Sequence, residues 1–312
     1  MYRFILFILV FLATSANATT NITVSDYQRT YVPVYTQDGT LSIAIRVFKR
    51  NNVPSFLIVN TNNLATSVVP IAKISLTDGK NNNRLGDYAQ WQIERTNYYQ
   101  LLQKYTAKPY TIENYGITHA KSGVEGNILT IDMCQSSVFF EKDFFDQLAA
   151  MATRKPIPIA LSLSGLWLLM HQEEFKYLLS LQQNNKLKIT WINHSFSHPY
   201  YDDLPHTKNF LLSEMINEDN EILLTEQYLL EADQIPSVFF RFPGLVSDKK
   251  LIMKIKQFGL LPLGADTWIA KHQLITKGGI ILVHGNGNEH DGINELTPKL
   301  KQLKLIDINE NI

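Results

Sequence analysis

Two histidines, His194 and His198, follow an apolar run at residues 187–192 and are separated by three residues. Imidazoles four positions apart can lie on one side of a helical turn, where both reach a single divalent ion. The pair therefore predicts a metal site at the end of a strand. By itself the spacing is a weak signal, because His pairs of this kind also occur without a metal.

Three further polar side chains follow apolar runs in the same way. Asp132 comes directly after residues 128–131, Arg241 ends the run at residues 238–241, and His284 comes directly after residues 279–283. Each also has a structural interpretation: the Asp as a turn former or helix cap, the Arg as an ion-pair partner, and the His as a half-buried side chain. Their shared position after strands favours chemistry over these alternatives.

Asp266 and Trp268 form a fourth group, after an apolar run at residues 260–264. The carboxylate could orient a neighbouring charged group, whereas a lone Trp at such a position is commonly part of a core. The pair is informative only together with the other strand ends.

The elements that position these side chains form an alternating pattern after residue 126. Apolar runs predict strands at residues 128–131, 157–163, 187–192, 238–241, 260–264, 279–283 and 303–308, and helical periodicity lies between them at 144–153, 173–183, 209–232, 249–258 and 294–301. This alternation predicts an α/β fold, a parallel (β/α) barrel with seven strands that is incompletely closed. In such barrels the chemistry lies at the carboxyl ends of the strands.

In order and placement, these motifs resemble those of the polysaccharide deacetylases, the NodB-like carbohydrate esterase family four. The matching stretches are 130–133, 194–198, 241–243, 266–268 and 282–284, and the resemblance covers roughly residues 126–312. Residues 193–199 are its most specific part.

The resemblance implies a divalent metal ion, commonly zinc, held by His194 and His198. It implies that Asp132 is the general base that takes a proton from water, with Arg241 orienting it. His284 then matches the general acid that protonates the leaving amine.

The same resemblance assigns the remaining positions to tuning and to substrate binding. Asp266 matches the acid that orients or tunes a neighbouring charged group, although Thr267 stands where the family has a second acid. Leu282 would line the pocket for the acetyl methyl group, and Trp268 would form one wall of that pocket.

The chain departs from the family at Met133, where a metal-binding carboxylate is expected. A thioether is a poor ligand for zinc compared with a carboxylate. Three interpretations stay open: a substitute ligand (Asp132, Cys134, Asp202 or Asp203), metal binding by Asp132 with loss of the catalytic base, or loss of catalysis with glycan binding retained.

The composition excludes some partners. The 29 Lys plus Arg balance 29 Asp plus Glu, so the chain has no excess of positive charge for nucleic acid or an anionic membrane. Cys134 is the only cysteine, so no intrachain disulfide forms and the fold depends on packing.

The first residues predict export. Arg3 precedes an apolar run at residues 4–13, and residues 16–18 (Ala-Asn-Ala) fit a signal-peptidase site. The run is shorter than the roughly 20 residues that span a bilayer. We expect a signal peptide at residues 1–18, a periplasmic or secreted protein, and no membrane insertion after cleavage.

The expected organisation has two further parts. Residues 25–74 have a β-like, hairpin-containing pattern and residues 91–105 a helical one, which indicates a β-rich N-terminal extension of unknown role over residues 19–122. Residues 123–312 form the barrel domain. The predicted function is metal-dependent removal of N-acetyl groups from a glycan, and the alternative is a catalytically inactive glycan-binding or scaffold protein on the same barrel.

Overall fold

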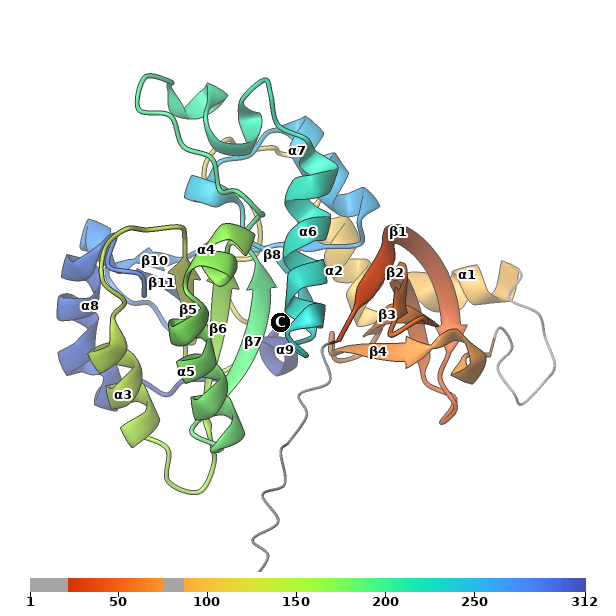
Figure 1. Ribbon diagram of the computed structural model, residues 1–312, viewed down its shortest axis with the longest axis horizontal. Coiled ribbons are helices and arrows are strands. Elements are labelled where there is room, and N and C mark those ends of the chain that lie inside the picture. Colours follow the sequence, from red (N-terminus) through yellow and green to blue (C-terminus); the bar gives the residue numbers. More distant parts are fainter. Residues whose placement is uncertain (1–21, 76–86) are drawn as a thin grey trace, which may run out of the picture.

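The computed structural model describes residues 22–75 and 87–312, with side chains from residue 90 in the second range, and contains two sheets. Figure 1 shows the N-terminal sheet on the right and the larger sheet on the left, with a long helix between them. The predicted signal peptide lies outside the described residues. Within the described ranges, none of the helices is both long and apolar enough to cross a bilayer.

The N-terminal sheet has four antiparallel strands in sequence order, more than the hairpin that the sequence indicated. They are β1 (Val24–Tyr35), β2 (Leu41–Arg50), β3 (Val53–Asn60) and β4 (Thr66–Pro70). β2 and β3 are joined by Asn51 and Asn52, which both have positive φ angles, 51° and 63°. Two such residues form the tight turn whose twist matches that of a hairpin, and Asn tolerates this conformation well.

Two helices follow where the sequence predicted one at residues 91–105. α1 (Asp87–Glu94) and α2 (Asn97–Tyr105) are separated because Thr96 caps α2: its hydroxyl oxygen accepts a hydrogen bond from the backbone N–H of Tyr99. A capping Thr has non-helical backbone angles, which ends one helix and starts the next.

The larger sheet confirms the expected fold class. Its strands run in the order β10-β11-β5-β6-β7-β8-β9, all pairs are parallel, and its two edge strands do not pair with each other. The strands are β5 (Ile128–Met133), β6 (Ile157–Leu163), β7 (Leu187–Asn193), β8 (Pro236–Phe240), β9 (Leu261–Pro262), β10 (Thr267–Trp268) and β11 (Ile280–His284).

One predicted strand is wrong. Residues 303–308 make a single bridge, between Leu305 and Asn127, and the seventh strand is the two-residue β10 instead.

Residues 114–120 bridge the end of edge strand β9 and the start of β11. Ile117 N donates to Pro262 O and Ile117 O accepts from Gly264 N, while Thr118 O accepts from Ile280 N. Gly116 has a φ of 128°, and a Cβ there would lie 2.4 Å from Pro262 O, so this approach requires glycine. The domain boundary after residue 122 stays a prediction, and this segment packs on the barrel.

Most helices of the barrel pack on the outer surface of the sheet, whereas the last short helix contributes Ile308 to the cluster that contains Ile128 and Ile192. The helices are α3 (Lys142–Ala150), α4 (Gly165–Met170), α5 (Gln172–Gln183), α6 (Glu218–Glu231), α7 (Lys249–Gln257), α8 (His290–Leu296) and α9 (Ile308–Asn311). The helix expected from residue 209 begins only at Glu218, because Asn217 caps it through the backbone N–H of Asn220. The helix expected at residues 294–301 is α8 followed by a 3-10 turn at Thr297–Gln302.

The alternation of β5 separates the core from the site. Leu129, Ile131 and Met133 belong to the apolar cluster that includes Phe144 and Phe145 of α3. Successive side chains of a strand point to opposite faces, so Thr130 and Asp132 face the interior of the barrel. This alternation decides which side chains can reach the carboxyl ends of the strands.

Candidate active site

Asp132 and Arg241 form a buried pair at the carboxyl ends of β5 and β8. Asp132 Oδ1 lies 3.9 Å from Arg241 Nε, and both side chains are almost fully buried. Burial raises the pKa of the Asp132 carboxyl, but Arg241 and two nearby imidazoles outweigh burial and hold the pKa below its ordinary value. The carboxylate is therefore ionised at neutral pH.

The Arg241 guanidinium is also held by a second residue of β5. Its Nη2 donates a 2.8 Å hydrogen bond to Thr130 Oγ1, which donates to Ile281 O. Among the described residues, Asp132 Oδ1 and two guanidinium nitrogens of Arg241 have no hydrogen-bond partner. Buried polar atoms in this state are costly, which indicates a binding site for a polar ligand.

His194 presents one ring nitrogen to the same space. Its Nδ1 lies 2.9 Å from Arg241 O and donates to that carbonyl, which makes Nε2 the acceptor nitrogen of the ring. Nε2 lies 3.6 Å from Asp132 Oδ2 and 3.5 Å from Cys134 Sγ. Burial lowers the pKa of His194, so the ring is neutral, the state in which imidazole binds metals.

The two histidines approach each other through a loop and not through the expected helical turn. Ser195 and His198 have positive φ angles of 67° and 44°, so the chain bends sharply after β7. The ring centroids of His194 and His198 still lie 4.7 Å apart. The left-handed conformation costs about 1–2 kcal/mol for each such residue, so this loop needs support from its surroundings.

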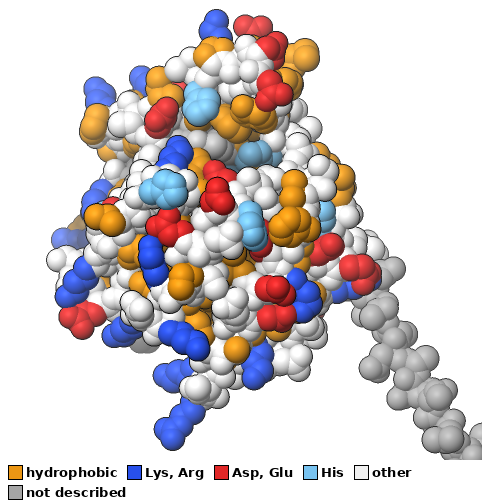
Figure 2. Space-filling view, turned by 90° about the vertical axis from the view of Figure 1, so that its left-hand side faces the viewer, with side chains coloured by type: hydrophobic (Ala, Val, Ile, Leu, Met, Phe, Trp, Pro, Cys, Tyr) orange, Lys and Arg blue, Asp and Glu red, His pale blue; other side chains and the backbone are white. Residues whose placement is uncertain are grey.

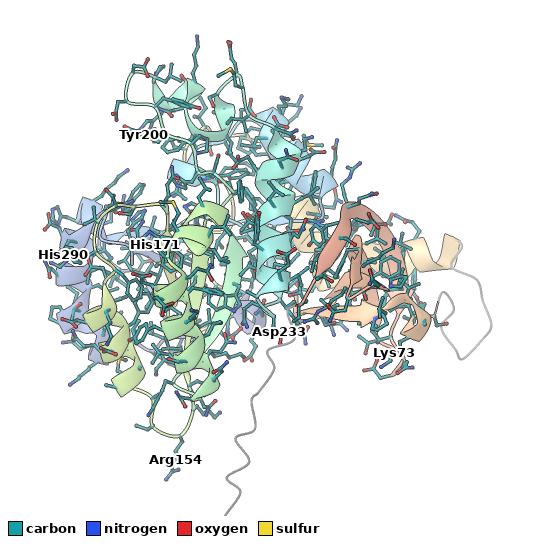
Figure 3. All side chains as sticks on the ribbon, viewed as in Figure 1. Lys73, Arg154, His171, Tyr200, Asp233 and His290 are labelled. Carbon is teal, nitrogen blue, oxygen red and sulfur yellow. The ribbon has the colours of Figure 1, made fainter. Side chains whose placement is uncertain are left out.

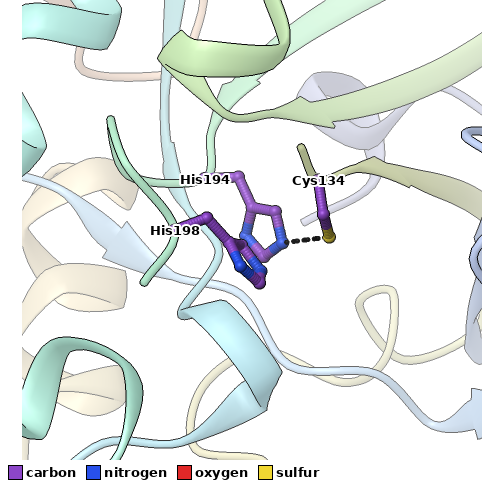
Figure 4. Close-up of side chains that lie close together, drawn as sticks. All are labelled: Cys134, His194 and His198. Carbon is purple, nitrogen blue, oxygen red and sulfur yellow. Dashed lines mark hydrogen bonds between the residues drawn. The ribbon is translucent and has the colours of Figure 1, made fainter. Parts of the chain in front are cut away.

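Cys134 completes a group of three metal-binding side chains (Figure 4). The ligand atoms of Cys134, His194 and His198 all lie within 4.8 Å of one another, and within the described ranges this is the group that could hold a metal ion. Burial raises the pKa of the Cys134 thiol, but His198 and His284 outweigh burial and lower it to about 7. A thiol with this pKa is readily ionised.

The donor set fits zinc. Zinc bonds of about 2.3 Å to sulfur and about 2.0–2.1 Å to nitrogen in a tetrahedron place the two ligand atoms about 3.6 Å apart. The observed distance from Cys134 Sγ to His194 Nε2 is 3.5 Å. A thiolate and two imidazoles are ligands that suit zinc.

The other substitute ligands considered from the sequence lie elsewhere. Asp202 and Asp203 are exposed and are not part of the metal-binding group. Asp132 lies near His194 but outside that group as well. Cys134 directly follows β5, and continuing the alternation of that strand places residue 134 on the side of Asp132 and opposite Met133, which is the signal that favours Cys134.

Met133 is fully buried in the core between the sheet and α3. We expect Met133→Asp to lower the free energy of unfolding by at least about 3 kcal/mol, since shortening a core Met costs about 2–5 kcal/mol and a buried carboxylate adds a desolvation cost. Thermal or urea unfolding measures this. Met133→Leu is the control and should cost less than about 1.5 kcal/mol. A stable Met133→Asp protein with tighter metal binding would mean that residue 133 reaches the metal site.

His284 is paired with Glu289, a residue that the sequence analysis missed. His284 Nδ1 lies 2.8 Å from Glu289 Oε2, as an ion pair that is not aligned like a hydrogen bond. Burial lowers the pKa of His284, whereas its contacts with Cys134 and Glu289 raise it well above its ordinary value. The ring is therefore protonated. Glu289 follows a Gly-rich turn at residues 285–287, and this return of the chain toward His284 was the available signal.

Asp266 does not contact His284 in the structure. Its carboxylate contacts Thr276 and Thr267, and its Oδ1 lies 3.1 Å from His119 Nε2. Because β10 starts only at Thr267, Asp266 precedes the strand and lies away from its carboxyl end. The orienting role expected for Asp266 therefore fits Glu289 better.

Trp268 and Leu282 come together beside His284. They share an apolar cluster with Leu245 and Ala265, and the ring centroids of Trp268 and His284 lie 6.0 Å apart. Trp268 Nε1 donates a 2.6 Å hydrogen bond to Glu289 Oε2. The cluster is an apolar wall beside a cationic group.

One face of the molecule is of mixed polarity (Figure 2). On the face in Figure 2, Lys, Arg, Asp and Glu are interspersed and several His side chains gather in the upper half. Figure 3 shows His171, His290 and Tyr200 on the barrel side of the molecule, away from the N-terminal sheet. No large surface of a single charge is visible on this face.

Comparisons with known proteins give one family model and several solved structures. Residues 25–99 match the model described as the RP012 protein N-terminal domain. A family 4 carbohydrate esterase from Bacillus anthracis is similar, with 18% identity, a TM-score of 0.47, and coverage of 69% of this chain and 90% of that chain. A CE4 family pseudoenzyme from Bacillus anthracis has 15% identity and a TM-score of 0.43, and the match covers 64% of this chain and 69% of that chain. The peptidoglycan deacetylase PdaC from Bacillus subtilis has 17% identity and a TM-score of 0.41, and the match covers 60% of this chain and 90% of that chain. The similar structures thus include members of the family that the motifs resemble.

Proposed function

We propose that this chain is a metal-dependent hydrolase that removes N-acetyl groups from an N-acetylated polysaccharide. One observation supports this most directly: the Asp132–Arg241 pair, the Cys-His-His group and the His284–Glu289 pair converge at the carboxyl ends of the strands. Amide hydrolysis needs an activated water, a stabilised oxyanion and a protonated leaving nitrogen. The three groups match these needs, and the glycan class rests on the motif resemblance.

Cys134, His194 and His198 would hold the metal ion, for which zinc is the best match to the donor set. When bound, such an ion supplies polarisation of the acetamide carbonyl and a lower pKa for water. The hydrogen bond from His194 Nδ1 to Arg241 O fixes the ring so that Nε2 faces the site.

The other residues handle protons and orientation. Asp132 accepts the proton of the attacking water, and Arg241 keeps its carboxylate ionised and directed. His284 gives its proton to the leaving amine and is stabilised in its protonated form by Glu289. Leu282 and Trp268 form the apolar wall against which the acetyl methyl group packs.

A second function, glycan binding without hydrolysis, is favoured by one observation. Among the described residues, the metal-binding group contains a thiolate and no carboxylate. A soft thiolate donates more charge to the metal ion than a carboxylate does. This charge would make the metal ion a weaker Lewis acid.

Acetate release from N-acetylglucosamine oligomers distinguishes the two functions. We expect zinc-loaded protein to release acetate, chelator-treated protein to release none, and zinc to restore the activity. Oligomer binding by zinc-loaded protein without acetate release would support the binding function and contradict the hydrolase.

Glu289→Gln tests the pairing with His284. We expect kcat to fall about 10–100-fold, the size of effect typical for a residue that orients a functional group, while KM changes little. The neutral amide no longer stabilises protonated His284, the form that donates the proton. Steady-state kinetics measure this, with Glu295→Gln on α8 as a control that leaves kcat unchanged. An unchanged kcat in Glu289→Gln would remove Glu289 from the account.

The proposal places this activity outside the cytoplasm. It rests on the leader-like pattern of residues 1–18, and on the glycan class that the motifs imply. Sequencing the N-terminus of the mature protein tests it, with Thr19 as the expected first residue.

A further inference from the structure

The loop that carries His194 and His198 is held by one face of α6. Thr225 Oγ1 donates to Ser195 O at 2.7 Å, and the Glu221 carboxylate accepts from the backbone N–H groups of Phe196 and Ser197 at 3.0 and 2.9 Å. These contacts satisfy the backbone of a loop that contains two residues with positive φ. The position of α6 therefore determines the position of the two histidines.

Asn193 connects the same helix to the start of the loop. Its Nδ2 donates to Ile222 O at 2.8 Å and to Glu226 Oε1 at 3.4 Å. Its Oδ1 accepts from Ser195 N at 2.9 Å. Asn193 directly precedes His194, so a shift of this amide moves the first imidazole.

Glu226 also binds two side chains of the N-terminal sheet. Arg46 of β2 binds it in a bidentate manner, with Nε 2.6 Å from Oε2 and Nη2 2.8 Å from Oε1, and Tyr27 of β1 donates to Oε2 at 2.9 Å. Arg46 Nη1 also donates to Phe258 O at 2.7 Å. Arg46 and Glu226 are both fully buried, so neither charge has water as an alternative partner.

We propose that Arg46 is a positioning residue for the His194–His198 loop, acting through Glu226 and Asn193. The expected effect on metal binding rests on the proposed function. Without Arg46, the buried Glu226 carboxylate retains Tyr27 and Asn193 as its donors and draws the Asn193 amide away from Ile222 and Ser195. The N-terminal sheet thereby acquires a role at a site to which it contributes no side chain in the described residues.

Arg46→Met tests the proposal, and Arg50→Met is the matched control. Arg50 lies on the same strand and pairs with Asp233 beyond the end of α6, across the same interface but at its exposed edge. Figure 3 labels Asp233 at this junction. The two variants remove the same cation from the same strand, and only one of them reaches Asn193.

Two measurements apply to both variants. Amide hydrogen exchange reports the protection of Ser195, Phe196 and Ser197 relative to amides of α5, and a competition titration reports zinc affinity. For Arg46→Met we expect selective loss of loop protection and zinc binding weakened by about 10–100-fold, the range seen when a partner of a metal ligand is lost. For Arg50→Met we expect neither change.

A double variant, Arg46→Met with Glu226→Met, serves where the single variant unfolds. Removing both members of a buried ion pair is much better tolerated than removing one. The double variant should be folded, and because it also removes the Glu226 oxygen that accepts a hydrogen bond from Asn193 Nδ2, its loop amides should exchange faster than those of Arg50→Met. Loop protection and zinc affinity equal to those of Arg50→Met would overturn the proposal. If the unaltered protein binds no zinc but the exchange pattern is as expected, the proposed function fails and the positioning role stands.

Discussion

Asp132→Asn is expected to reduce kcat for acetate release by about 10²–10⁴-fold, the contribution of a general base. The amide cannot accept the proton of the attacking water. It is nearly the same size as the carboxylate and still lies beside Arg241, so the barrel should remain folded. Steady-state kinetics and a thermal unfolding curve for the same preparation measure both expectations.

Asp266→Asn is the control for this substitution. Asp266 is also an Asp next to a strand of the sheet, but its carboxylate contacts Thr276 and His119 instead of the groups at the site. The kcat of the Asp266→Asn protein should equal that of the unaltered protein. An Asp132→Asn protein with full activity, or equal losses in the two variants, would remove Asp132 as the base.

Cys134→Ala is expected to weaken zinc binding by at least about 100-fold. It removes a ligand atom, and losing even a partner of a ligand costs about 10–100-fold. Cys134→Asp should regain part of the affinity, because a carboxylate oxygen is a zinc ligand as well. A competition titration measures the affinities, and cobalt in place of zinc adds a thiolate-to-metal absorption band that both variants should lack.

Met133→Leu is the matched control, since residue 133 is the last residue of β5 and precedes Cys134 in the chain but faces the core. Its metal affinity and its cobalt spectrum should equal those of the unaltered protein. A cobalt band that persists in Cys134→Ala, or unchanged zinc affinity in that variant, would show that the thiolate is not a ligand.

The alternation of strands and helices in the second half was sufficient to predict the barrel. β5, β6 and β7 begin at the predicted residues because each is a compact apolar run with a polar residue directly after it. β10 was not predicted because two residues cannot form a pattern, and the run at residues 303–308 is apolar for packing and makes only one bridge. Short edge strands depend on their neighbours more than on their own sequence.

The site was predictable where a residue directly follows a strand. Asp132, His194, Arg241 and His284 come together because parallel strands end at one edge. Glu289 was missed because it returns to His284 through a turn, and Asp266, expected to orient an unspecified charged group, lies beside His119 in the structure. Motif matching located His194 and His198 as candidate ligands, and the alternation along β5 favours Cys134 as the third.

The contribution of the N-terminal sheet had no signal in the sequence. Arg46 lies in an apolar strand and Glu226 in an amphipathic helix, 180 positions apart, and neither belongs to a motif. Their pairing follows from the packing of the two sheets on either side of α6 (Figure 1). A buried charge in a strand indicates a partner, but it does not identify that partner.

Anomalous scattering at the zinc edge, from a crystal of zinc-loaded protein, tests the central claim most directly. We expect one strong peak bonded to Cys134 Sγ, His194 Nε2 and His198, with a zinc–sulfur distance of about 2.3 Å. A peak bonded to other side chains, or no peak at this position in a protein that releases acetate, would contradict it.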